Sequence, residues 1–139
     1  MVQIISGQKG KGKTKHLIEL ANKSVKEAEG TVVYLDKSSK HMYELDKKIR
    51  LINVKDYPVE SADGFIGFIC GLISQDHDLQ TVFLDSFLKV ANLEGADITS
   101  TIDELEKLGN KRNITFVLSI SLDESELPTN AKNDVIISL

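Results

Sequence analysis

The sequence has few of the residues that build disulfide bonds, metal centres and aromatic binding platforms. Its 139 residues include one cysteine, two prolines and no tryptophan. A single cysteine excludes an intrachain disulfide framework and any multi-cysteine zinc or iron–sulfur site, and the three histidines lack the spacing of a zinc site. The absence of tryptophan argues against an aromatic platform for single-stranded nucleic acid.

The sequence is also short of positive charge and of long hydrophobic segments. Seventeen lysines and arginines against 21 acidic residues give a formal charge of −4, so no overall positive field is available to attract nucleic acid or an anionic membrane. No apolar run reaches the roughly 18 residues of a membrane span, and the N-terminus lacks the features of a signal peptide. We therefore expect one domain over residues 1–139, located in the cytoplasm, without membrane insertion and without an evident nucleic-acid surface.

Hydrophobic patterning predicts alternating strands and helices. Five apolar, β-branched runs are predicted to be strands, at residues 2–6, 31–35, 81–84, 114–120 and 134–139. Helical spacing predicts helices at residues 14–28, 62–74 and 102–108, the last one ending at Gly109-Asn110. A short helix at 42–48 and a short strand at 50–54 are weaker expectations. Continuous apolar strands joined by helical connections predict a three-layer α/β/α fold with a mostly parallel central sheet of about five strands.

The most informative segment lies between the first strand and the first helix, where the sequence matches G-x-x-x-x-G-K-[ST] at each fixed position. Glycines let backbone N–H groups turn inward around a phosphate, and the helix N-terminus directs its positive dipole end at the same anion. Lys13 is predicted to contact the β- and γ-phosphates of a nucleotide, and the Thr14 hydroxyl to bind Mg²⁺. The predicted nucleotide-binding segment comprises Gly7, Gln8, Lys9, Gly10, Lys11, Gly12, Lys13 and Thr14.

Positive charge gathers at this segment although the chain is acidic overall. Lys9, Lys11, Lys13 and Lys15 account for four of its 17 basic residues. Lys9 and Lys11 are either additional phosphate contacts or solvated loop residues. The polyanion that this arrangement favours is a single nucleotide.

The other half of the predicted site is acidic. It is Asp85, which follows the apolar run at residues 81–84. Ligands bind at the carboxyl ends of strands in open α/β sheets, and a nucleotide-bound Mg²⁺ needs a carboxylate there. Asp36 follows the run at 31–35 in the same way and is either a catalytic base for an attacking water or an Asx-turn residue. The residue after Asp85 is Ser86, whose hydroxyl is a weak base for activating water.

Other polar residues receive weaker predictions. Arginine occurs only at Arg50 and Arg112, each before a predicted strand and therefore at the opposite end of the sheet from the phosphates. The segment after residue 36 offers Lys37 or Lys40, each either a cation for the site or a solvated lysine. Ser119 and Ser121 are candidate sensors of the γ-phosphate, because their strand is expected between the strands that end near residues 6 and 84. Cys70 is expected in the core.

Two of these segments resemble known motifs. Residues 7–14 are similar to a Walker A motif, and residues 82–86, with Leu-Asp-Ser, are similar to the Walker B strand of RecA-like and KaiC-like ATPases. The resemblance to the P-loop NTPases implies binding of ATP, in preference to GTP, with Mg²⁺ held by Thr14 and Asp85. It implies catalytic roles for Lys13 and Asp85, and hydrolysis coupled to assembly or motion. Asp36 stands where the recombinases carry a catalytic glutamate, which leaves its role open.

Three functions are compatible with the sequence. The first is a Mg²⁺-dependent ATP-binding protein with slow or partner-stimulated hydrolysis and a minimal RecA-like core. The second is a small P-loop kinase acting on a nucleoside or metabolite, and the third is a regulatory module that binds nucleotide without significant hydrolysis. Since 139 residues leave almost nothing for a lid or a substrate domain, a protein partner or a homo-oligomer is expected.

Overall fold

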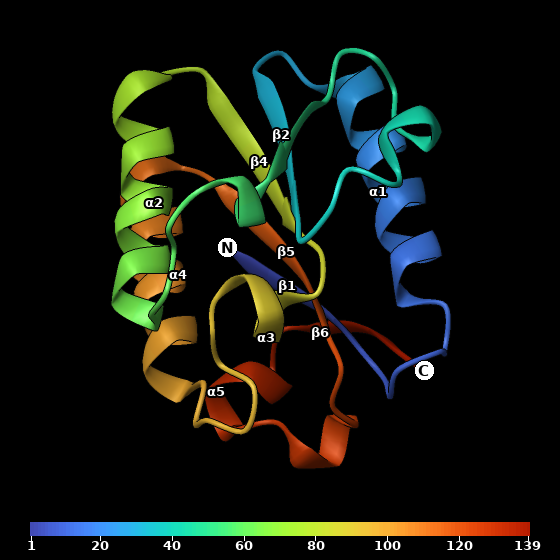
Figure 1. Ribbon diagram of the computed structural model, residues 1–139, viewed down its shortest axis with the longest axis vertical. Coiled ribbons are helices and arrows are strands. Elements are labelled where there is room, and N and C mark those ends of the chain that lie inside the picture. Colours follow the sequence, from blue (N-terminus) through green and yellow to red (C-terminus); the bar gives the residue numbers. More distant parts are fainter.

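Six parallel strands form one sheet, which lies between two layers of helices (Figure 1). The computed structural model describes residues 1–139. In sequence order the strands are β1 (Val2–Ser6), β2 (Thr31–Asp36), β3 (Arg50–Asn53), β4 (Leu79–Leu84), β5 (Thr115–Ile120) and β6 (Val135–Ser138). The predicted three-layer α/β/α fold is confirmed. The sheet has six strands instead of about five, because the short run near residue 50 pairs with β2.

The helices divide unequally between the two faces of the sheet. They are α1 (Lys13–Glu27), α2 (Ala62–Gln75), α3 (Phe87–Val90), α4 (Thr99–Arg112) and α5 (Thr129–Lys132), with single 3₁₀ turns at η1 (Met42–Glu44), η2 (Val54–Asp56) and η3 (Glu124–Glu126). On one face α1 packs Leu17 and Ala21 against the sheet in a core of ten buried residues. Helices α2 to α5 cover the other face over a larger core of 23 buried residues.

Two helix predictions are wrong, one in the type of element and one in a boundary. The helix expected at residues 42–48 is a single 3₁₀ turn. Helix α4 does not stop at Gly109 but continues to Arg112 and ends at Asn113, which has a φ of 57°. Gly109 serves close packing instead: a Cβ atom there would lie 2.7 Å from the Ile114 carbonyl oxygen and 2.8 Å from the Met1 nitrogen. The glycine that predicted a helix end is therefore explained by close packing inside the helix.

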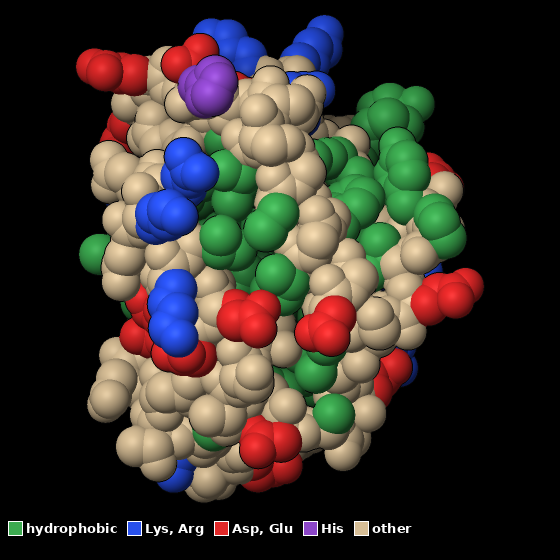
Figure 2. Space-filling view, turned by 90° about the vertical axis from the view of Figure 1, so that its left-hand side faces the viewer, with side chains coloured by type: hydrophobic (Ala, Val, Ile, Leu, Met, Phe, Trp, Pro, Cys, Tyr) green, Lys and Arg blue, Asp and Glu red, His purple; other side chains and the backbone are tan.

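Helix α2 is less buried than its hydrophobic sequence predicts. Only Phe65 and Ile69 are buried among its residues, and hydrophobic side chains gather at the surface of the face that includes it (Figure 2). Cys70 is exposed, so the prediction of a core position for it is wrong. The residue follows Ile69 by one step and so turns away from the sheet. None of the helices is both long enough and apolar enough to span a bilayer.

The strand order brings distant segments together at one edge of the sheet. The order is β3-β2-β4-β5-β1-β6, so β5 lies between β1 and β4 as the sequence predicted. Leu118 of β5 is in register with Ile4 on one side and with Leu84 on the other. The segments that follow β1, β4 and β5 consequently emerge next to one another at the carboxyl edge, where ligands bind in parallel sheets.

Candidate functional site

The segment between β1 and α1 has the backbone of an anion-binding loop. Gly10 and Gly12 have φ values of 86° and 88°, a conformation that side-chain-bearing residues rarely adopt. Helix α1 starts at Lys13 with no side-chain cap and no acidic residue in its first turn. The first N–H groups of a helix lack partners within the helix, so those of α1 are free to bind an anion together with the positive dipole end.

Lys13 is held across this loop instead of extending into solvent. Its side chain is only 8% exposed, and its Nζ donates a hydrogen bond of 3.0 Å to the Gln8 carbonyl oxygen. Burial lowers the pKa of Lys13, whereas the charge of Asp85 opposes that shift. The ammonium group is therefore held against the loop backbone, within the field of the Asp85 carboxylate.

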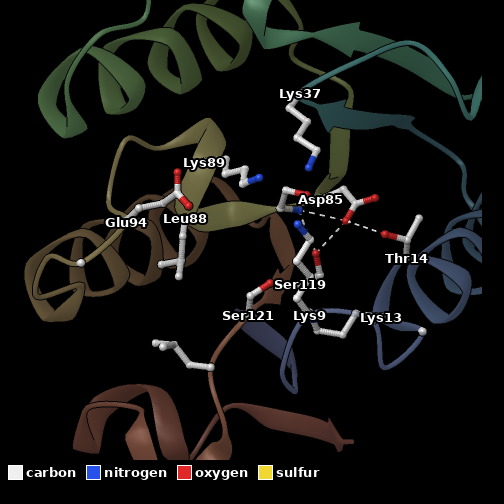
Figure 3. A pocket seen from close by; sticks show the side chains of 15 residues that line it. Lys9, Lys13, Thr14, Lys37, Asp85, Leu88, Lys89, Glu94, Ser119 and Ser121 are labelled. Carbon is white, nitrogen blue, oxygen red and sulfur yellow. Dashed lines mark hydrogen bonds between the residues drawn. The ribbon is translucent and has the colours of Figure 1, made fainter.

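Asp85 is the centre of a hydrogen-bond network that joins four parts of the chain, and Figure 3 shows its bonds within the cavity. Its Oδ1 accepts hydrogen bonds from Thr14 Oγ1 at 3.2 Å, from Ser119 Oγ at 2.8 Å and from the Ser86 backbone N–H at 2.9 Å. Its Oδ2 accepts one from the Tyr34 hydroxyl at 2.8 Å. These donors fix the orientation of the carboxylate toward α1. The structure thus brings together Thr14 and Asp85, the two residues that sequence reasoning assigned to Mg²⁺.

Tyr34 is a site residue that sequence reasoning missed. It is completely buried in β2, and burial, followed by the charge of Asp85 and their hydrogen bond, raises its pKa. The hydroxyl consequently remains a donor to Asp85 at any physiological pH. A signal for it exists, because a buried tyrosine needs a partner for its hydroxyl group. The identity of that partner follows only from the pairing of β2 with β4.

Asp36 is buried beside this network without joining it. The residue is 2% exposed. Its Oδ1 accepts a 2.7 Å hydrogen bond from the Lys37 backbone N–H, and its Oδ2 has no partner. Burial and the charge of Asp85 raise its pKa, opposed by the Lys37 hydrogen bond and by the charges of His41 and Lys37. Asp36 does not line the cavity at the site, and its hydrogen bond goes to the N–H of the next residue, one position short of the contact that defines an Asx turn.

A cavity of about 510 Å³ opens at the carboxyl edge of the sheet and contains most of the predicted residues. The glycine-rich loop supplies Lys9, Gly10, Gly12, Lys13 and Thr14 to its wall. Ser119 and Ser121 line it from the end of β5, and Asp85 lies between them and Thr14. Gly7, Gln8, Lys11 and Lys40 are not part of its wall.

The opposite side of the cavity is lined by residues that the sequence did not indicate, and by one, Lys37, for which it allowed two roles. Lys37 lines it, as do Leu88 and Lys89 of α3, and Glu94 and Gly95 in the segment after α3. Both arginines lie elsewhere: Arg50 is 3.7 Å from Asp76 in an ion pair, and Arg112 borders a separate cavity at the other end of the sheet. The positive groups of the site are therefore all lysines.

The residues present fit a magnesium-bound nucleotide. An anion cradle, a hydroxyl and a carboxylate oxygen lie within one cavity, and Mg²⁺ commonly takes only one or two protein ligands besides phosphate oxygens and water. The structure contains no group of three or more histidine, cysteine or acidic side chains suited to a metal by themselves. No family model matches the chain, and no curated protein matches its sequence.

Proposed function

We propose that this chain is a Mg²⁺-dependent ATP-binding protein of the P-loop type with a minimal RecA-like core, and that it hydrolyses ATP slowly or under stimulation by a partner. The observation that carries the proposal is the 3.2 Å hydrogen bond between Thr14 Oγ1 and Asp85 Oδ1. It joins two motif residues that are 71 positions apart in the chain, directly beside an uncapped helix N-terminus. Bound Mg²⁺ would neutralise phosphate charge at this point.

A slow rate follows from the carboxylates around the cavity. A general base must lie within hydrogen-bond reach of the attacking water. Asp85 is already engaged by four donors, and Asp36 does not line the cavity. Glu94 lines it but is exposed in the segment after α3 and accepts no hydrogen bond that would orient it. A partner that orders this segment would raise the rate.

Titration of labelled ATP and GTP, with and without Mg²⁺, tests the binding step. We expect Lys13→Ala to weaken ATP binding about 10- to 100-fold, because a charge-assisted hydrogen-bond donor to phosphate is lost. Lys23→Ala, an exposed position on the same helix, is the matched control and should leave the affinity unchanged. Equal affinities of wild type and Lys13→Ala for ATP would rule the proposal out.

A small-molecule kinase is the second candidate, favoured by the extent of the cavity. Its wall continues past Asp85 along Leu88, Glu94 and Leu122, which are remote from the glycine-rich loop in sequence, and an acceptor molecule could bind there. The test is phosphoryl transfer from ATP to a panel of nucleosides and metabolites. Transfer to an acceptor faster than to water supports the kinase, and phosphate release into water alone excludes it.

A binding module without turnover is the limiting case of the first proposal. Purified wild-type protein would then bind ATP while releasing no phosphate above background, and Asp36→Asn would change nothing. Clear release of phosphate by the wild-type protein, without any partner, would exclude a module that only binds nucleotide. The single unpaired cysteine supports a cytoplasmic location. The hydrophobic surface near α2 supports a protein partner or a second copy of the chain.

A further inference from the structure

Two lysines from different parts of the chain converge on the cavity from the side opposite the glycine-rich loop. Lys37 follows directly after β2, and Lys89 lies in α3, four residues after Asp85. Both side chains are half-buried and line the cavity. They point toward its centre, and Asp85 lies between them and Lys13 (Figure 3).

Neither ammonium group has a carboxylate partner within ion-pair distance. The ion pairs of the structure involve other residues, among them Lys107 with Asp103. Lys37 and Lys89 instead lie within reach of each other: after burial, contact with Lys89 is the main cause that lowers the pKa of Lys37. Asp36 is the acidic residue whose charge acts on Lys37, but its carboxylate accepts a hydrogen bond from the Lys37 backbone N–H and none from the ammonium group.

This arrangement is unfavourable until an anion enters the cavity. Like charges that approach one another in a partly buried setting repel more strongly than they would in water. Four lysines face the cavity, against Asp85, which is engaged by its donors, and Glu94, which is exposed. Since the whole chain carries a net charge of −4, this local excess of positive charge indicates a multiply charged anion as the ligand.

The position of the pair indicates which part of the anion it contacts. The glycine-rich loop and the start of α1 form one wall, suited to the inner phosphates. Thr14 and Asp85, the pair suited to Mg²⁺, come next, and Lys37 and Lys89 lie beyond them. A phosphate chain that starts at the loop and passes the metal therefore ends between the two lysines.

We propose that Lys37 and Lys89 form a clamp for the terminal phosphate of a nucleoside triphosphate. The clamp supplies, from within the same chain, the cations that neither arginine is placed to provide. It rests on the proposed function, because it assumes that the loop binds a nucleotide. Its consequence is selectivity: the site distinguishes a triphosphate from a diphosphate, and a partner need not contribute an arginine to complete it.

Binding of Mg-ATP and Mg-ADP to wild type, Lys37→Ala, Lys89→Ala and the double variant tests the clamp. We expect each single substitution to weaken ATP binding about tenfold, through loss of a charge-assisted contact, while ADP binding stays within about twofold, the scale of a weak field effect at this distance. The double variant should lose most of the wild-type preference for ATP over ADP, and Lys13, which is unchanged, should account for what remains. Lys40→Ala is the matched control, since Lys40 is exposed in the same segment and does not line the cavity.

The outcomes separate the clamp from the function on which it rests. If wild type binds ATP but the variants bind it equally well, or lose ATP and ADP affinity to the same extent, the clamp is wrong and the nucleotide site stands. If wild type binds neither nucleotide, the proposed function is wrong and the clamp with it. Thermal unfolding of the ligand-free variants verifies folding, and melting at or above the wild-type temperature is expected because a like-charge contact is removed.

Discussion

Asp36 ends β2 and Asp85 directly follows the neighbouring strand β4, and both are 2% exposed, yet the two carboxylates differ in their hydrogen-bond partners. Asp85 accepts hydrogen bonds from four donors. Asp36 accepts one, from the next residue, and its second oxygen has no partner. A buried carboxylate is stabilised by such donors and destabilised without them, so the fold stabilises the Asp85 carboxylate, whereas burial of Asp36 costs free energy of folding.

The neighbouring strands account for the difference. Strand β4 lies between β2 and β5, which supply Tyr34 from one side and Ser119 from the other to Asp85. Strand β2 has β3 as its outer neighbour, and there Asn53 is in register with Asp36. The Asn53 side chain accepts from the Lys55 N–H and so is engaged in its own turn. The carboxylate after β4 thus receives donors from both adjacent strands, whereas the carboxylate at the end of β2 receives none from either.

Removal of the Asp85 carboxylate should have the largest effect. Asp85→Ala leaves the buried hydroxyls of Tyr34 and Ser119 without their acceptor, so we expect the free energy of unfolding to fall by about 3 kcal/mol. The Mg²⁺-dependent part of ATP binding should disappear as well. Urea denaturation and nucleotide titration measure the two losses. Asp85→Asn is the control: it keeps the shape and an acceptor oxygen, and should lose metal dependence with a smaller loss of stability. Wild-type stability in Asp85→Ala would contradict the network.

Removal of one donor should have the next largest effect. Tyr34→Phe deletes only the hydroxyl that donates to Asp85 Oδ2 at 2.8 Å. We expect a loss of about 1–2 kcal/mol in the free energy of unfolding, because a buried charged acceptor loses a partner. Tyr43→Phe removes a hydroxyl from a side chain that is 92% exposed and should be neutral in the same denaturation experiment. Equal stability of the two variants would mean that the Tyr34 hydroxyl contributes nothing.

The sequence predicted one half of this comparison well. The glycine-rich loop and its lysine are local signals, since the strand, loop and helix that they need are consecutive. The position of Asp85 at a strand end was also predictable, because the apolar run before it is unbroken. Its donors were not, because Tyr34 and Ser119 reach it only through the order of the strands.

Features that depend on packing between helices were also beyond the sequence. Gly109 carries the signal of a helix end, yet the close approach of Ile114 and Met1 explains it. Cys70 lies in a hydrophobic helix of which only two residues are buried. The sequence did not indicate Lys89 as a cavity residue, because its place in the cavity wall beside Lys37 depends on how α3 packs against the segment after β2. Sequence pattern states which residues are apolar, but not which of two neighbouring elements covers them.

A gain of stability is expected at the unpartnered carboxylate. The pKa of Asp36 is raised by burial and by Asp85, against His41 and Lys37, so its ionisation opposes folding and stability is lost as pH rises through its folded-state pKa. Asp36→Asn should therefore raise the free energy of unfolding at pH 7 by about 1 kcal/mol and flatten its decline with pH. Denaturation from pH 4 to 8 measures both. A destabilised variant would show that Asp36 has a partner in solution.

The smallest effect is expected at a second carboxyl pair, remote from the site. Asp134 precedes β6 at the amino-terminal edge of the sheet; burial and Glu106 raise its pKa to about 6, and the N-terminal amino group opposes this shift. Its contribution to stability is full below its ordinary pKa of 3.8 and is lost as pH rises through about 6. Asp134→Asn should remove that loss, worth at most about 1 kcal/mol because solvent screens a partly exposed group.

Combination of the last two substitutions decides whether the carboxylates act independently. Asp36 and Asp134 lie at opposite edges of the sheet, so their effects on the free energy of unfolding should add within about 0.5 kcal/mol. The double variant should consequently have the flattest pH dependence of the set between pH 4 and 7. A double variant no more stable than Asp36→Asn alone would show that ionisation of Asp134 contributes nothing to the pH dependence of folding.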